Sequence, residues 1–251
     1  MLAKERLYNI MNRLNVQPFI TIQELCDDLN VSTSTVHRDL IALEKEGKIV
    51  RDRGGVIQKR MNALISVINE APVLDKVAIH NDEKSRICRQ AAQFIKEGDC
   101  IFIDTGTTVT GLLPFIENKK ITLVTNSIYL VNKLSKMTGN VFLVGGNYSI
   151  KYLMNTGSFT IDELRRFKFD ACFLSANGVD VNRGETYVSE FDAGSIKRTV
   201  MERSTQKFLL VDSSKFEVTG IFNFSSLNAF THVITDKSPS GLHKPENLII
   251  C

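Results

Sequence analysis

The chain has 251 residues, a formal net charge of +3 and hydrophobic residues at 43% of its positions. This length is sufficient for a small domain and a second domain with a substantial hydrophobic core. The small net charge excludes a polycationic protein. Its five cysteines are scattered, without a C-x-x-C pair or a His/Cys cluster, which argues against a structural zinc site and a disulfide framework. No apolar run approaches a membrane span and no signal core follows the charged N-terminus, so we expect a cytoplasmic protein without a membrane partner, a metal or another cofactor.

The first thirty residues predict two helices. An apolar stripe indicates a helix over residues 3–15, and Pro18 breaks that pattern. Thr21 and Glu24 have the spacing of a capping box, in which the threonine caps the helix and the glutamate side chain reaches back to the cap. This box opens the second helix. The apolar positions of the second helix are Ile22, Leu25 and Leu29.

A third helix follows after a very short turn. Ser32 is placed to cap it, because its hydroxyl can accept a backbone N–H of the first turn, and Gly47 can end it in a left-handed conformation. One face is apolar and the other carries short polar side chains and cations, which suits the major groove of DNA. An ordinary amphipathic surface helix is the alternative. The apolar face has Val36, Leu40 and Leu43, and the polar face has Ser34, Arg38 and Lys45, flanked by Thr33 and His37.

Residues 48–50 and 56–57 predict the two strands of a hairpin behind the third helix. The turn between them holds Arg51 and Arg53, so the hairpin is a wing that carries two cations. Two helices joined by a short turn are what a helix-turn-helix requires. Residues 32–60 contain seven cations and four acids, a local excess of three positive charges where phosphate contacts would be needed.

This stretch resembles the N-terminal winged helix of DeoR-type bacterial transcription regulators, whose pattern is approximately V-S-x-x-T-[IV]-R-R-D-L-x-x-L-E-x-x-G-x-[IL]-x-R-x-H-G-G. The chain departs from it twice, because His37 replaces the first arginine of the usual pair and Arg53 replaces the wing histidine. Both positions are expected to face DNA, so the operator sequence does not transfer from relatives. The matching residues are Val31, Ser32, Thr35, Val36, Arg38, Asp39, Leu40, Leu43, Glu44, Gly47, Ile49, Arg51, Gly54 and Gly55.

The resemblance implies a DNA-binding domain over residues 1–57, with the helix-turn-helix motif at about 20–39. We expect Ser34, His37 and Arg38 to approach base edges, whereas the hydroxyls and cations around them mainly contact the DNA backbone. The DNA-binding candidates are Ser32, Thr33, Ser34, Thr35, His37, Arg38, Lys45, Arg51, Arg53, Gly54 and Gly55.

Residues 58–75 are the expected linker, and from residue 76 onward helix and strand patterns alternate. A helix is predicted over residues 84–96, before Gly98. The continuous apolar runs that follow are typical of strands buried on both faces of a parallel sheet. Residues 76–251 therefore predict an α/β domain of the doubly wound kind. The strand-length runs are 100–103, 121–124, 141–144, 171–174, 207–211 and 232–235.

Polar loops, rich in glycine and hydroxyl residues, follow five of these runs. Ligands of such sheets bind beyond the carboxyl ends of the strands. Glycine lets backbone N–H groups approach an anion, hydroxyls and amides can hydrogen-bond it, and Lys215 can supply a charge. A phosphate with attached hydroxyls suits these loops best, and plain turns are the alternative. The loops begin at Asp104, Thr125, Gly145, Ser175 and Asp212.

The segment from Lys84 to about Phe216 resembles the DeoR-type sensor domain through D-x-G-T-T, T-N-S, G-G, F-[IL]-G-x-x-G-[IV] and D-x-S-K-F. Sensor domains of this family resemble ribose-5-phosphate isomerase, with a mostly parallel sheet, and typically bind phosphorylated sugars. The same fold and ligand class are implied for residues 76–251. The effector-binding candidates carried over are Asp104, Gly106, Thr107, Thr108, Thr125, Asn126, Ser127, Gly145, Gly146, Asn177, Gly178 and Lys215.

The sensor segment also has its own departures. Ser175 stands where the family usually has glycine, and Lys76 stands where relatives often have arginine. Glu190 and the Lys197–Arg198 pair, with residues 184–186, lie near the region that varies with the sugar in this family, in a less secure register.

The chain is therefore expected to be a sequence-specific transcription regulator, and the resemblance implies a repressor of sugar-metabolism genes. A phosphorylated sugar is expected to modulate its binding to the operator. Its partners would be double-stranded operator DNA, that sugar and further copies of the chain in a dimer or tetramer, since palindromic half-sites need paired DNA-binding domains.

One alternative is an isomerase-like enzyme fused to a DNA-binding module. Proton transfer needs a positioned carboxylate, and only Asp104 stands clearly at a strand end, while Asp180 matches the isomerase pattern in part. The other alternative is an architectural DNA binder without a ligand.

Overall fold

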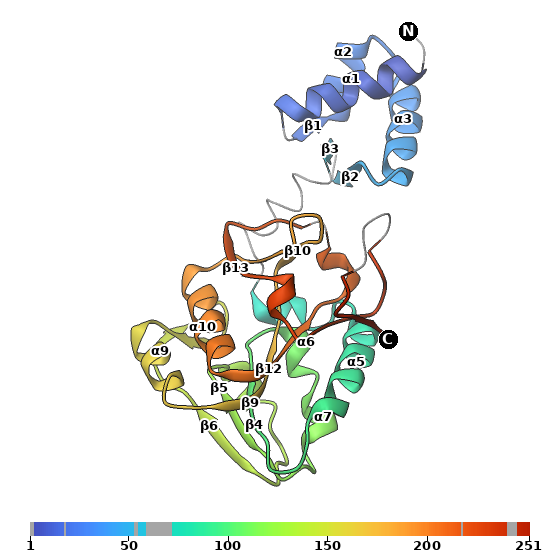
Figure 1. Ribbon diagram of the computed structural model, residues 1–251. Helices are drawn as coiled ribbons and strands as arrows, with labels where there is room; N and C mark the ends of the chain where they lie inside the picture. The colour runs from blue at the N-terminus through green and yellow to red at the C-terminus, as the bar shows by residue number, and fades with distance from the viewer. Residues whose placement is uncertain (1–2, 18, 53–54, 59–71, 217, 240–244) are drawn as a thin grey trace. The chain divides into compact units, whose positions relative to one another are not determined.

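The computed structural model describes residues 3–17, 19–52, 55–58, 72–216, 218–239 and 245–251 (Figure 1). The chain divides into two compact units, Met1–Ser66 and Val67–Cys251. Of the predicted features, Pro18, Arg53, Gly54 and most of the linker at 58–75 lie outside the described residues.

The N-terminal unit is a winged helix, in which three helices pack with a three-stranded antiparallel sheet of order β1-β3-β2. Its core contains the apolar residues predicted for the three helices, and Leu14, Val36 and Leu40 are completely buried. The wing is confirmed, since β2 pairs with β3, and β1 is a third strand that the sequence did not predict. The elements are α1 Ala3–Val16, β1 Phe19–Thr21, α2 Ile22–Leu29, α3 Thr33–Lys45, β2 Ile49–Asp52 and β3 Gly55–Gln58.

Local hydrogen bonds fix the ends of these helices. The capping box is present, because the Glu24 N–H donates to Thr21 Oγ1 (3.2 Å) and the Thr21 N–H donates to Glu24 Oε2 (2.7 Å). Gly47 has the predicted left-handed conformation, with a φ of 70°. The predicted cap at Ser32 is wrong in one respect. Ser32 occupies the cap position, but its hydroxyl bonds to the hydroxyls of Ser34 (2.9 Å) and Thr35 (3.0 Å) instead of a backbone N–H.

The C-terminal unit is built on a seven-stranded, fully parallel sheet of order β15-β14-β12-β9-β4-β5-β6. All six strands predicted from the apolar runs are present, and β15 is added at one edge. The strands are β4 Cys100–Ile103, β5 Thr122–Thr125, β6 Asn140–Leu143, β9 Phe169–Leu174, β12 Ser204–Leu210, β14 His232–Thr235 and β15 Leu248–Ile250.

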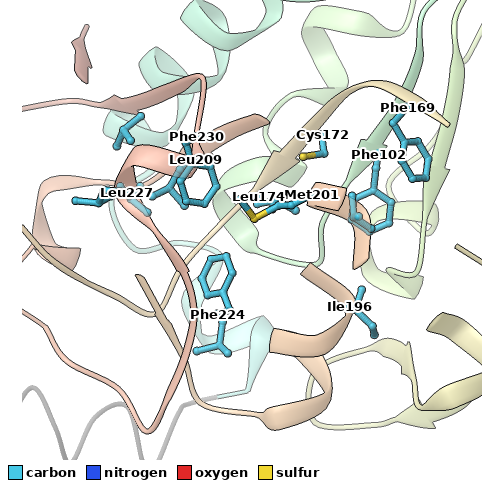
Figure 2. Packing of buried hydrophobic residues seen from close by; sticks show 14 of the residues in the cluster. Phe102, Phe169, Cys172, Leu174, Ile196, Met201, Leu209, Phe224, Leu227 and Phe230 are labelled. Atoms are coloured by element: carbon cyan, nitrogen blue, oxygen red, sulfur yellow. The ribbon is translucent and has the colours of Figure 1, made fainter. Parts of the chain in front are cut away.

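Two apolar clusters cover the two faces of this sheet, because successive strand residues point to opposite faces. Phe102 belongs to the cluster beneath α10 (Phe191–Glu202), which contributes Ile196 and Met201 (Figure 2). Ile101 belongs to the opposite cluster, to which α5 (Asn81–Ala91) contributes its apolar face. The helices α5 and α10 therefore lie on opposite sides of the sheet (Figure 1).

Two small antiparallel sheets and several single turns complete the unit. One sheet pairs β7 with β8, and the other has the order β10-β11-β13. None of these short strands was predicted. The remaining elements are η1 Val73–Lys76, η2 Ala92–Phe94, α6 Thr107–Thr110, α7 Leu113–Ile116, α8 Ile128–Val131, β7 Asn147–Ser149, β8 Met154–Thr156, α9 Ser158–Leu164, β10 Gly178–Asp180, β11 Glu185–Val188, η3 Ser213–Lys215, β13 Phe222–Ser226 and η4 Leu227–Ala229.

Two sequence predictions for this unit need correction. The helix expected over 84–96 is α5, which begins at Asn81 and ends at Ala91 before the single turn η2. The strand β6 is not buried on both faces, because all four of its residues are exposed at the edge of the sheet. No helix among the described residues is long and apolar enough to cross a membrane.

Candidate functional site

The helix α3 presents its polar side to solvent. Ser34, Arg38 and Lys45 are exposed, opposite the buried apolar residues of the same helix. Asp39 is buried instead, where its carboxylate accepts from both Nε (2.6 Å) and Nη2 (3.0 Å) of Arg6 on α1. This bidentate pair joins the two helices and fixes the orientation of α3. Asp39 matches the family pattern, but this role in joining α1 to α3 was not predicted.

Two residues that the sequence placed on different elements contact each other. Arg51 on β2 has its Nη2 atom 3.4 Å from Nδ1 of His37, and its Nη1 atom 3.9 Å from Oε2 of Glu44. A guanidinium has donors only, so His37 must accept through Nδ1 and carry its proton on Nε2. The helix α3 and the wing therefore form one polar surface.

The remaining DNA-binding candidates have mixed surroundings. Thr33 is exposed and Thr35 is half-buried. Gly55 is buried, and a Cβ atom there would lie 2.3 Å from Cζ of Phe19. Packing against Phe19 is therefore the reason for glycine at this position.

In the C-terminal unit, a cavity of about 130 Å³ lies beyond the carboxyl ends of β4, β9 and β12. Five of the effector-binding candidates line it: Gly106, Thr107, Thr108, Asn177 and Lys215. They come from the loops after β4, β9 and β12, as expected for a doubly wound sheet.

The T-N-S candidates do not line the cavity, because their side chains are buried in local hydrogen bonds. Thr125 donates to the carbonyl oxygen of Ile103 (2.7 Å), and Asn126 donates to the carbonyl oxygen of Asn155 (2.8 Å). The hydroxyl of Ser127 accepts the N–H of Leu130 and caps α8. These residues hold the loop in shape.

The other glycine candidates also have packing roles. The carbonyl oxygen of Gly145 accepts from Thr160 Oγ1 (2.7 Å). Gly146 has a φ of 150°, and a Cβ there would lie 2.0 Å from the same hydroxyl. At Gly178 a Cβ would lie 2.2 Å from the carbonyl oxygen of Val218. None of these three glycines lines the cavity.

Asp104 lies behind the cavity wall and is already fully engaged. Its Oδ2 atom accepts from the N–H (3.0 Å) and the hydroxyl (2.7 Å) of Ser175 and forms an ion pair with the ammonium of Lys197. Burial acts to raise the pKa of Asp104, but Lys197 and the hydrogen bonds from Ser175 hold that pKa below its usual value. Lys197 and Ser175 line the cavity, whereas Asp104 does not.

A second charged group contains three lysines. Lys76, Lys84 and Lys215 line the cavity with the carboxylate of Asp212. Lys84 is buried and donates to the carbonyl oxygen of Lys76 (2.7 Å). Burial lowers the pKa of Lys84, the neighbouring lysines lower it too, and Asp212 opposes them. Nδ1 of His80 lies 3.5 Å from Oδ1 of Asp212.

The sequence did not single out Lys84 or Asp212 as ligand-binding residues. Lys84 was taken only as the start of a helix, and Asp212 only as the start of a loop. Tyr152, whose hydroxyl donates to Oε1 of Glu190 (3.1 Å), also lines the cavity and was not predicted. Among the described residues, no group of three or more His, Cys, Asp or Glu side chains is placed to hold a metal ion.

Comparisons with known proteins agree with this division of the chain. A model of the DeoR-like helix-turn-helix domain matches residues 6–60, and a model of the DeoR C-terminal sensor domain matches residues 79–237. The chain is 31% identical over 241 residues to the HTH-type transcriptional repressor GlcR of Bacillus subtilis (strain 168), covering 96% of this chain and 91% of that protein. It is 34% identical over 248 residues to the lactose phosphotransferase system repressor of Lactococcus lactis subsp. lactis, covering 97% and 94%.

Among solved structures, ribose 5-phosphate isomerase A of Methanocaldococcus jannaschii is similar over 54% of this chain and 54% of that one, with 16% identity and a TM-score of 0.41.

Proposed function

Because the chain belongs to the DeoR family of DNA-binding transcription regulators, we propose that it represses genes of sugar metabolism and that a phosphorylated sugar, bound in the cavity of its C-terminal unit, modulates operator binding. The polar side of α3 and the wing would contact the operator. Both relatives described above are named as repressors, and the Lactococcus lactis protein is named as the repressor of the lactose phosphotransferase system.

The lysine group is the observation that carries the ligand assignment. Lys76, Lys84 and Lys215 line the cavity together with Asp212, so this group contributes three lysines and one carboxylate. Burying a cation is unfavourable unless it is paired, and burial of Lys84 lowers its pKa accordingly. A phosphate dianion would offset this repulsion and accept hydrogen bonds from all three lysines.

Hydroxyl and amide groups supply the rest of a sugar-phosphate site. Thr107, Thr108 and Asn177 line the same cavity, and such groups hydrogen-bond the hydroxyls of a sugar. A site with a cationic group and several neutral polar groups matches a ligand that has one phosphate and several hydroxyls.

Catalysis by Asp104 is disfavoured by its surroundings. A general base needs a free carboxylate within reach of the substrate proton, whereas Asp104 is buried behind the wall and holds Ser175 and Lys197. The relatives are transcription regulators, which also argues against the isomerase alternative.

The assignment is tested by thermal unfolding of the full chain with a set of pentose and hexose phosphates. A ligand at 100 times its Kd should raise the free energy of unfolding by about 2.7 kcal/mol. Lys215→Gln should abolish this effect, whereas Lys96→Gln, at an exposed residue outside the cavity, should leave it intact. The best ligand is then added to a DNA-binding assay. If no sugar phosphate stabilises the protein, the architectural DNA binder becomes the better description, and turnover of any of them would indicate an enzyme.

We further propose that the working form is a dimer or tetramer, since two half-sites of a palindromic operator need paired helices.

A further inference from the structure

The cavity has two walls that differ in charge. The first wall, defined here as Lys76, Lys84, Lys215 and Asp212, joins the α5 side of the sheet to the turn η3. Its three cations face one carboxylate. The second wall belongs to α10, on the opposite face of the sheet (Figure 1).

The second wall contains one cation and two carboxylates. Lys197 and Glu190 line the cavity, and Asp104 lies directly behind Lys197. The formal charge of this wall is therefore −1, against +2 for the first wall. A ligand that enters this cavity meets a net positive wall and a net negative wall.

Lys197 on the second wall is already neutralised. Its side chain is only 5% exposed, and that of Asp104 is 4% exposed, so water screens this pair little. Asp104 is held in place by two hydrogen bonds from Ser175. An ammonium has three N–H donors, so Lys197 can still donate to a ligand hydroxyl, but its charge is balanced before any ligand arrives.

From this arrangement we propose that the cavity selects ligands with a single anionic group, bound at the first wall, and an uncharged hydroxyl-bearing end, bound at the second. Asp104 is the positioning residue that excludes a second anion, because it cancels the charge of Lys197. Sugar bisphosphates and phosphorylated aldonic acids would thus be rejected in favour of the matching sugar monophosphates. This inference rests on the proposed binding of a phosphorylated sugar.

The exclusion follows from charge and not from size. A second phosphate at the second wall would face Glu190 and an ion pair of zero net charge, and it would lose its hydration without gaining a free cation. A hydroxyl at the same place has no charge to desolvate and can use the N–H donors of Lys197. Without the carboxylate of Asp104, Lys197 would become a free cation and would attract a second anion.

The test is calorimetric titration of the full chain with matched pairs: fructose 6-phosphate with fructose 1,6-bisphosphate, glucose 6-phosphate with 6-phosphogluconate, and ribose 5-phosphate with ribose 1,5-bisphosphate. In every pair that binds, the native protein should prefer the monophosphorylated neutral sugar at least tenfold. Asp104→Asn retains an oxygen that can accept from Ser175, and it should reduce that preference to below threefold or reverse it. Circular dichroism checks that the variant is folded.

A second variant keeps the test decisive if Asp104→Asn does not fold. Glu190 is exposed at the start of α10, so Glu190→Gln changes the same wall by one charge without disturbing the buried pair, and it should also narrow the preference. The matched control is Glu202→Gln, an exposed glutamate at the other end of α10 and outside the cavity, which should leave the preference unchanged.

Two results would overturn the inference: a native protein that binds the bisphosphate or the aldonic acid as tightly as its partner, or folded variants at Asp104 and Glu190 that keep the native preference. In both cases sugar-phosphate binding itself would stand. If no member of any pair binds, the proposed ligand class fails, and the inference fails with it.

Discussion

Arg38 lies on the exposed side of α3, where a guanidinium can make a bidentate contact with a guanine edge. We predict that Arg38→Ala weakens binding to the operator by about 1–3 kcal/mol, roughly 5- to 150-fold, and relaxes discrimination at one base position. Lys45→Ala should instead weaken binding to all sequences alike and lower its salt dependence, because a phosphate contact carries no sequence information. Both are measured by titration of labelled DNA at several salt concentrations. An unchanged operator footprint for Arg38→Ala would remove this residue from the interface.

His37 and Arg51 should act as one unit, since Nδ1 of the imidazole accepts from the guanidinium. Each single alanine variant removes the same contact, so we predict that their effects on operator affinity do not add, with a coupling of at least about 0.5 kcal/mol in a double-mutant cycle. Nitrogen chemical shifts of the imidazole should report the form protonated on Nε2. Additive effects, or a proton on Nδ1, would contradict this pairing.

At the scale of elements, the N-terminal caps of α2 and α3 show how far local structure can be predicted from sequence. The spacing of Thr21 and Glu24 predicted a capping box that is present, because both hydrogen bonds lie within four residues. The cap at Ser32 was wrong in detail, since neighbouring hydroxyls at Ser34 and Thr35 compete for the same oxygen. Local spacing determines which groups are available, and side-chain competition decides which bond forms.

The sheet shows the corresponding limit for non-local structure. Apolar runs located six of the seven parallel strands, because such strands are continuous in hydrophobicity. The order of the strands does not follow from the runs, so the sequence could not show that β6 is an edge strand, and Phe142 on it is 47% exposed.

The cavity was predicted in part for the same reason. Loops that follow β4, β9 and β12 meet because these strands are neighbours in the sheet, and Thr107, Asn177 and Lys215 accordingly line one cavity. Thr125 and Gly146 carry the same chemistry in their loops, but their polar groups are used in packing. Lys84, on a helix, carries no motif that would mark it as part of the site.

The capping box also gives a prediction about pH. Hydrogen bonds from the backbone and side chain of Thr21 lower the pKa of Glu24 from its usual 4.5. A carboxylate whose pKa is lower in the folded state stabilises that state above its unfolded pKa, and this contribution is lost as the pH falls through the folded value. Thr21→Val should cost about 1 kcal/mol of N-terminal stability at neutral pH, and less below the usual pKa of glutamate.

Thermal unfolding followed by circular dichroism, for the native chain and Thr21→Val at neutral pH and at about pH 3, measures this difference. Thr205→Val, at an exposed threonine of β12 in the other unit, is the control and should show no such dependence on pH. If the difference between the native chain and Thr21→Val is the same at both pH values, Glu24 takes no part in the cap.

At the scale of the whole molecule, the proposed DNA contacts belong to one compact unit and the proposed ligand contacts to the other. Regulation then requires a coupling free energy between them, and such a coupling is reciprocal. We predict that the best sugar phosphate changes the Kd for operator DNA by about 5- to 150-fold, and that operator DNA changes the Kd for this sugar phosphate by the same factor. The equality holds whether the ligand releases the DNA or strengthens its binding.

Four titrations of the native chain check this prediction: DNA with and without saturating ligand, and ligand with and without saturating operator. Lys215→Gln should lose the effect of ligand on DNA while binding free DNA normally, and Arg38→Ala should bind the ligand normally. A change in DNA affinity without the matching change in ligand affinity would mean that the ligand acts at another site or on the assembly state. If neither the Kd for DNA nor the Kd for the ligand changes, the cavity binds its ligand without controlling operator binding. A ligand with equal affinity for two states cannot shift the equilibrium between them.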